Sequence, residues 1–131
     1  MRLYYLRVGG RLKHALDIVA THAGQRLAMR AIVDSGGDFC VFDLEIAAQL
    51  NIAIDRSAGV NVSGIGGQII VCPGQLDIEL RGRILPLRAF FAPNLPMNLL
   101  GRDNFFHHFI VQFDEINHEL KLLTRRGSQS N

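Results

Sequence analysis

Short segments in which apolar side chains alternate with polar ones recur along most of this sequence. Residues 16–20 and 76–80 show the alternation most clearly, and an apolar run at 27–33 reads as a more buried strand. A period of two residues places successive side chains on opposite faces of a β-strand. Turn-forming residues separate the segments at 22–25, 64–67 and 81–83. The pattern predicts about seven to nine short strands and an all-β barrel or sandwich.

Two short segments depart from this alternation and predict helices. Residues 43–51 place Leu44, Ala47, Ala48 and Leu50 on one side of a helix, with Asp43 as the N-cap. Residues 102–109 predict a second, shorter helix. Because strands do not alternate with full-length helices, a parallel α/β sheet is not expected.

Composition limits the classes of protein and of partner. The 131 residues are enough for one domain with a real core, and 48% hydrophobic residues do not fit disorder. The net charge is only +2 and the basic residues are scattered, so we expect no nucleic-acid partner. No apolar run reaches the length of a membrane span, and no secretory signal is evident, so a cytoplasmic location is the default expectation.

Metal and disulfide chemistry are not expected either. Cys40 and Cys72 are too few for a disulfide framework or a metal site, and Cys40 reads as a small core residue. Their pairing with each other stays open. His107 and His108 lack a third ligand at a suitable spacing, so we assign them to the surface of a short helix.

The segment AIVDSGGD, residues 31–38, ends a buried strand with a carboxylate. Burying an unpaired carboxylate is costly, so Asp34 either faces water in an ordinary turn or belongs to an active site. The Ser35 hydroxyl can donate a hydrogen bond, and the glycines that follow let a backbone approach closely. A glycine-rich hairpin tip, SGIGG, lies further along the chain, and Leu99–Leu100–Gly101 comes near its end.

In this order and spacing the three elements resemble the retropepsin family, the single-domain aspartic proteases of retroviruses and their bacterial and eukaryotic relatives. They read IVDSGGD, VSGIGGQII and NLLGRDNF in this chain, and the resemblance covers about residues 14–123. It implies a closed acid-protease β-barrel over 14–123, with a flap and two-fold homodimer symmetry. An N-terminal arm would precede it over 1–13, outside the core, and a polar tail would follow over 124–131.

The resemblance assigns the catalytic role to Asp34, with Ser35 and Gly36 completing the motif. The hydroxyl of Ser35 would brace two active-site loops against each other. Gly37 departs from the family, which usually has Ala or Ser there, and this affects pocket shape and rigidity. Asp38 matches an aspartate that commonly pairs with an arginine, here Arg102. The residues expected to contact substrate are Gly37, Asp38, Gly64, Ile65, Gly66 and Gly67, and those expected to support the site are Leu99, Leu100, Gly101 and Arg102.

The chemistry of this family needs two carboxylates, and the chain offers one such loop. Two like charges in contact share a proton, so one carboxylate activates a water while the other polarises the scissile carbonyl. The second Asp34 would come from a symmetry mate, which implies a homodimer built by the active-site loops and by the chain termini, HELKLL included. We therefore expect an aspartic endopeptidase that cleaves extended peptides without a cofactor.

Two other functions stay open at this point. The fold can serve as a dimeric peptide-binding or assembly module whose catalytic pair is idle. The chain can also be a monomeric β-barrel that binds a ligand and uses DSGG only as a turn.

Overall fold

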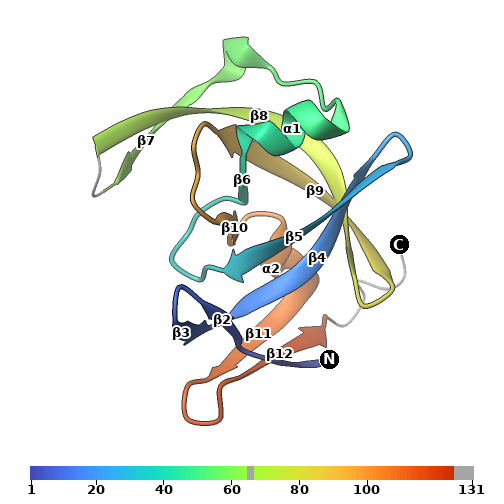
Figure 1. Ribbon diagram of the computed structural model, residues 1–131, viewed down its shortest axis with the longest axis vertical. Helices are drawn as coiled ribbons and strands as arrows, with labels where there is room; N and C mark the ends of the chain where they lie inside the picture. Colours follow the sequence, from blue (N-terminus) through green and yellow to red (C-terminus); the bar gives the residue numbers. More distant parts are fainter. Residues whose placement is uncertain (65–66, 126–131) are drawn as a thin grey trace.

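The protein is seen in a computed structural model that describes residues 1–64 and 67–125, and it is built mostly from antiparallel strands (Figure 1). The strands are β1 (Arg2–Tyr4), β2 (Leu6–Val8), β3 (Arg11–Lys13), β4 (Ala15–His22), β5 (Gln25–Val33), β6 (Val41–Asp43), β7 (Val60–Gly64), β8 (Gly67–Leu80), β9 (Arg83–Ala92), β10 (Asn98–Leu100), β11 (Phe109–Asp114) and β12 (Glu119–Thr124). The helices are α1 (Leu44–Leu50), the 3₁₀ turn η1 (Arg56–Ala58) and α2 (Phe105–His108). The prediction of a mainly β protein with short helices is confirmed. No helix in the described ranges has the length and apolar character needed to cross a membrane.

A seven-stranded sheet in the order β4-β5-β10-β6-β9-β8-β7 forms the body of the molecule. β4 also pairs with β8, so the hydrogen-bonded ladder leads from β4 through the sheet to β8 and back to β4. Most neighbours are antiparallel, but β10 runs parallel to β5 and β6 runs parallel to β9. The two parallel pairings join segments that are distant in the sequence, and β5–β10 carries the candidate site.

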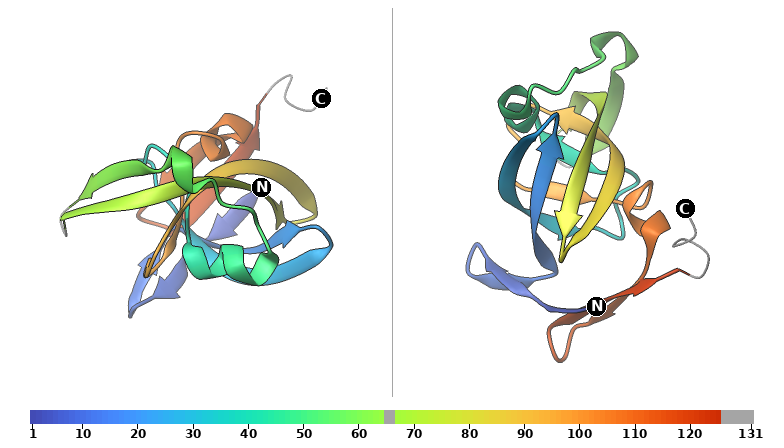
Figure 2. Two further views of the ribbon diagram at one scale, coloured as in Figure 1. Left: turned by 90° about the horizontal axis from the view of Figure 1, so that it is seen from above. Right: turned by 90° about the vertical axis from the view of Figure 1, so that its right-hand side faces the viewer.

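The two ends of the chain form a separate three-stranded sheet in the order β1-β12-β11. Leu3 is paired with Leu120 and is buried, and Tyr5 is buried beside it. The expectation that residues 1–13 lie outside the core is therefore wrong for Leu3 and Tyr5, because β12 offers them a sheet edge and apolar neighbours. Within residues 1–13, β2 and β3 form a separate two-stranded hairpin that projects from the body (Figure 2).

The core fills the space between the main sheet, the two helices and the terminal sheet. Its largest fully buried side chains include Phe42, Phe91, Phe105, Phe109 and Leu122. Burial of this kind contributes roughly 25 cal/mol for each Å² of apolar surface removed from water. Cys40 and Cys72 are both buried and both are free thiols.

The helix termini differ in detail from the sequence-based expectation. Asp43 stands at the N-cap of α1, yet its Oδ1 accepts a hydrogen bond from the Leu95 backbone N–H at 3.0 Å instead of capping the helix. Ala48, expected on the buried side, is exposed, while Ile46 is buried. Asn51 ends α1 in the left-handed conformation with φ 55°.

Tyr5 ties the first strand to the last hairpin, and its ionisation is expected to weaken the fold. The phenol donates a hydrogen bond to Glu115 at 3.1 Å. Burial first, then this bond and the charge of Glu115, raise the pKa of Tyr5 from 10.0 to about 12. The neutral phenol therefore stabilises the folded chain below pH 10.0, and this contribution is lost as the pH rises towards about 12.

Urea denaturation at about pH 9 and about pH 11 measures this contribution in the wild type and in Tyr5→Phe. The free energy of unfolding should fall more between the two pH values in the wild type than in Tyr5→Phe. Equal losses in both proteins would contradict the assignment.

Candidate active site

Asp34 stands directly after β5, where β10 runs alongside in parallel. Leu100 is in register with Val33, and the Asp34 backbone N–H donates to the Leu100 carbonyl at 2.9 Å. Val33 and Leu100 are both fully buried, so the strand pair that ends at Asp34 is anchored in the core. The sequence folds this way because both strands end in apolar residues and each is followed by glycine-containing chain.

The Asp34 carboxylate is half-buried and is oriented by its own loop. The Gly36 backbone N–H donates to Oδ1 at 3.1 Å, and the Gly37 N–H donates to the Asp34 carbonyl at 3.2 Å. A Cβ at position 37 would lie only 2.8 Å from Oδ2. The absence of that methyl group leaves room for the carboxylate in this position, which is the physical consequence of the departure at Gly37.

Gly101 packs against the same loop from the other side. A Cβ at position 101 would overlap the carbonyl group of Phe39 and would lie 2.9 Å from the Gly37 carbonyl oxygen. The next two backbone N–H groups then bond to the loop, Arg102 to Gly37 at 2.8 Å and Asp103 to Asp38 at 2.9 Å. A side chain at 101 would push the two segments apart, so the close approach requires glycine.

Asp38 and Arg102 also meet through their side chains, with Arg102 Nη2 2.8 Å from Asp38 Oδ1. Both side chains are well exposed, so this ion pair contributes little to stability, about 1 kcal/mol at most. Its position on the loop that follows Asp34 makes it a local brace of that loop. Ser35 is exposed, and within the described part of the chain its hydroxyl has no hydrogen-bond partner.

The hairpin of β7 and β8 extends from the body on the side where β5 ends (Figure 1). Val60, Val62, Ile69 and Val71 lie on one face of it, because Val60 pairs with Val71 and Val62 with Ile69. Gly64 pairs with Gly67, which has φ 107°. Ile65 and Gly66, the other two residues of the expected flap tip, lie outside the described residues.

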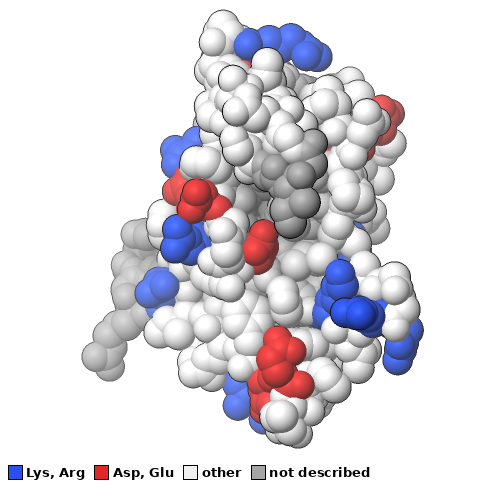
Figure 3. Space-filling view, turned by 90° about the vertical axis from the view of Figure 1, so that its left-hand side faces the viewer, with Lys and Arg blue, Asp and Glu red and all other residues white. Residues whose placement is uncertain are grey.

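Figure 3 shows this side of the molecule, where an acidic side chain is visible in a hollow below the hairpin. Backbone hydrogen bonds join the Asp34 loop to the segment Leu99–Arg102. The described part of the flap hairpin lies on the side of the molecule where β5 ends (Figure 1). The arrangement holds one oriented carboxylate at the end of β5, on the side of the molecule from which the β7–β8 hairpin extends (Figure 1). Within the described ranges no cluster of three His, Cys, Asp or Glu side chains could hold a metal ion.

The sequence profile of the aspartyl protease family matches residues 18–104 of this chain. The chain belongs to the aspartyl protease family. The match spans the β5 loop, the flap hairpin and the Gly101 segment. No curated protein matches the sequence significantly.

Several solved structures share the fold of this chain at low sequence identity. A retropepsin-like aspartic protease from Rickettsia conorii has a TM-score of 0.63 at 16% identity, over 92% of this chain and 97% of that one. The retroviral protease-like domain of Ddi1 from Leishmania major has a TM-score of 0.58 at 20% identity, over 86% of this chain and 90% of that one. The EIAV protease, solved with the inhibitor HBY-793, has a TM-score of 0.57 at 20% identity, over 75% of this chain and 89% of that one. The fold is therefore retropepsin-like, as the sequence motifs implied.

Sequence reasoning missed two residues, Asn98 and Cys40, whose side chains connect the segments around the candidate site. The Asn98 side chain bridges β5 and β6: Nδ2 donates to the Arg30 carbonyl at 3.2 Å and Oδ1 accepts from the Asp43 N–H at 3.0 Å. Cys40 donates through Sγ to the Asp103 carbonyl at 3.5 Å. Burial raises the pKa of the Cys40 thiol, so it stays protonated and available as a donor. Nothing local in the sequence signals either contact.

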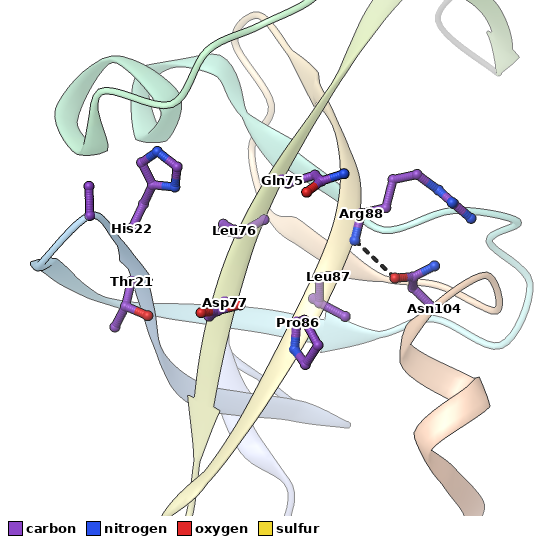
Figure 4. A pocket seen from close by; sticks show the side chains of 10 residues that line it. Thr21, His22, Gln75, Leu76, Asp77, Pro86, Leu87, Arg88 and Asn104 are labelled. Carbon is purple, nitrogen blue, oxygen red and sulfur yellow. Dashed lines mark hydrogen bonds between the residues drawn. The ribbon is translucent and has the colours of Figure 1, made fainter. Parts of the chain in front are cut away.

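The second helix is shorter than the expected range 102–109, since α2 covers only Phe105–His108. Asn104 is its N-cap residue, and the Asp103 side chain pairs with Arg88 at 3.1 Å. Asn104 Oδ1 in turn accepts the Arg88 backbone N–H at 2.9 Å, at the edge of a pocket of about 430 Å³ (Figure 4). This pocket is lined by parts of β4, β8 and β9, among them His22, Gln75 and Leu87, and by none of the residues expected in the active site.

Proposed function

We propose that this chain is an aspartic endopeptidase that acts as a homodimer, with one Asp34 from each protomer forming the catalytic pair. The observation that carries the proposal is the Asp34 carboxylate, oriented by the Gly36 N–H at the end of β5 in a member of the aspartyl protease family. Ser35 and Gly36 complete the catalytic loop. Asp38, Arg102 and the backbone of Leu99–Gly101 hold that loop in place.

The reaction follows from the properties of two carboxylates in contact. The pair shares one proton because both cannot ionise at close range. The ionised member removes a proton from a water, whose oxygen attacks the peptide carbonyl carbon, and the protonated member donates to the carbonyl oxygen. The tetrahedral intermediate then collapses, the C–N bond breaks and a proton passes to the leaving nitrogen. In each protomer the Gly36 N–H holds Oδ1 of Asp34, which leaves Oδ2 of the same carboxylate oriented for the proton transfers.

The pairing of β12, which contains most of HELKLL, limits how the chain termini can build the proposed dimer. β12 already pairs with β1 on one edge and with β11 on the other, so it has no free edge for a second copy. The terminal sheet can be extended across a two-fold axis only at β1 or β11 unless an existing pairing is given up. The loops that carry Asp34 and exposed Ser35 would meet at the same axis.

The substrate would lie extended beneath the flap hairpins, with its backbone paired to them in strand fashion. The apolar face of Val60, Val62 and Ile69 favours apolar side chains in the substrate. Gly37, Asp38 and the flap tip Gly64–Gly67 are the proposed contacts with the substrate.

Cleavage of a mixed peptide library at several protein concentrations, from acid to neutral pH, tests this proposal. The activity per chain should rise with concentration and level off where sedimentation shows only dimer, because a monomer has one Asp34. At high dilution the total cleavage rate should follow the square of the protein concentration. Cleavage that is proportional to concentration in a monomer would contradict the shared site, and a dimer that cleaves nothing would favour a binding module.

A further inference from the structure

The β2–β3 hairpin is the part of the chain that the catalytic proposal leaves without a role. Leu6–Val8 and Arg11–Lys13 pair only with each other and join neither larger sheet. All three residues of β3 are exposed, and none in β2 is buried. A two-stranded hairpin on its own is at best marginally stable in water. Within the chain the Arg30 guanidinium donates to the Arg7 carbonyl at 3.3 Å, and a partner would add contacts that the two larger sheets do not supply.

The hairpin is basic, and among the described residues its charges have no acidic partner. It carries Arg7, Arg11 and Lys13, and none of the three forms an ion pair with any other described residue. Arg7 donates to the Gly10 carbonyl at 3.0 Å, which closes the turn of the hairpin. Arg11 and Lys13 lie on the exposed strand β3, where their charges are accessible to an acidic partner.

The hairpin of β11 and β12 offers a surface of opposite charge. It contains a cavity of about 570 Å³ whose lining holds three carboxylates and one ammonium group, with residues Gln112, Phe113, Asp114, Glu115, Glu119 and Lys121. The Asn117 backbone and side chain donate to Asp114 and lower the pKa of that carboxyl, so it stays ionised into acid solution. Glu119 lies 3.8 Å from Arg2, and Glu115 accepts from Tyr5, so both are held at the cavity.

The β2–β3 hairpin and the turn between β11 and β12 both lie on the left-hand side of Figure 1, the side on which β5 ends and the second Asp34 is proposed to come. Figure 3 shows a basic cluster at the right and an acidic cluster at the bottom of the face that contains the hollow below the flap hairpin. In a two-fold dimer every contact between unlike surfaces forms twice, because each protomer gives both surfaces to its partner. A second copy of this chain would therefore bring an acidic surface to the hairpin and a basic surface to the cavity at the same time.

We propose that the β2–β3 hairpin of each protomer binds the acidic cavity of the β11–β12 hairpin of its partner, forming a pair of electrostatic clasps across the two-fold axis. This inference rests on the proposed homodimer and adds the surfaces that hold it together. It gives the N-terminal segment a function, and it supplies dimer contacts that do not require β12 to give up a pairing.

Reciprocal charge reversal tests the clasp. One chain carries Arg11→Glu with Lys13→Glu and keeps its acidic cavity. The other carries Glu115→Lys with Glu119→Lys and keeps its basic hairpin. Each chain alone brings like charges together at both clasps, so the dimer dissociation constant should rise about tenfold or more. When the two chains are mixed in equal amounts, a dimer of one of each has opposite charges at both clasps. The reversed, now acidic hairpin of the first chain meets the reversed, now basic cavity of the second, and the unchanged hairpin of the second meets the unchanged cavity of the first. Dimerisation and peptide cleavage should then return to within about threefold of the wild type.

Recovery on mixing separates a contact between protomers from one within a chain, since mixing cannot repair the latter. Arg56→Glu with Arg81→Glu gives the same change of charge on η1 and the β8–β9 turn and should leave the dimer unchanged. Thermal melting checks that each chain is folded, and the single reversals Lys13→Glu and Glu119→Lys, on separate chains, replace any double reversal that unfolds. The proposal is overturned if the folded reversed chains dimerise like the wild type or if mixing restores nothing. A wild type that neither dimerises nor cleaves would instead remove the proposed function.

Discussion

Gly101→Ala is expected to lower the free energy of unfolding by about 3 kcal/mol or more, the largest stability effect of any single methyl group near the site. The added Cβ would overlap the Phe39 carbonyl group and approach the Gly37 carbonyl oxygen at 2.9 Å. These are backbone atoms of a loop held by the Arg102 and Asp103 N–H groups, so they cannot rotate away as a flexible side chain can. The loop that carries Asp34 has to shift, and cleavage should fall with stability.

Gly36→Ala is the matched control for this substitution. A Cβ at position 36 would meet only the Asp34 Oδ1 atom, at 3.6 Å, which is an ordinary van der Waals contact. Neither position has a positive φ, so both substitutions change the backbone entropy of the unfolded chain in the same way. Urea denaturation of the two variants and the wild type gives the comparison. Equal stability of the two alanine variants would show that the loop accommodates a side chain at 101.

The class of fold could be predicted from the sequence because the alternation that specifies strands is local. Residues 16–20 and 76–80 carry their period of two in consecutive residues, and turn-forming residues mark where each strand ends. The strand β1 carries no such signal, since three residues are too few for a period. Its burial depends on β12 at the other end of the chain, which the sequence of Arg2–Tyr4 does not reveal.

The site divides in the same way between local and distant causes. The motif around Asp34 and the glycine at 101 could be found in the sequence, because a carboxylate after a buried strand and a glycine before Arg102 are local patterns. The register of β10 beside β5, the bridge made by Asn98 and the bond that Asp43 accepts from Leu95 could not. Each joins residues far apart in the chain, and an alternative partner nearby, such as the N-terminus of α1 for Asp43, looked equally suitable.

Asp34→Asn is expected to abolish peptide cleavage, with a loss of about a thousandfold or more, while the fold is kept. In the homodimer this single change removes both carboxylates, so neither a base for the water nor an acid for the carbonyl remains. The amide has nearly the same shape, and its oxygen can still accept the Gly36 N–H bond that Oδ1 accepts now. The half-buried position and this retained bond predict a free energy of unfolding within about 1 kcal/mol of the wild type.

Peptide-library cleavage and sedimentation of Asp34→Asn beside Asp77→Asn make the comparison specific. Asp77 is an exposed aspartate on β8, away from the flap tip and the Asp34 loop, so its amide variant should cleave like the wild type. If Asp34→Asn remains dimeric and cleaves like Asp77→Asn, the carboxylate pair is not the catalyst. If cleavage disappears while the dimer remains, the two carboxylates carry the reaction, because the same loss of one charge per chain at position 77 leaves cleavage intact.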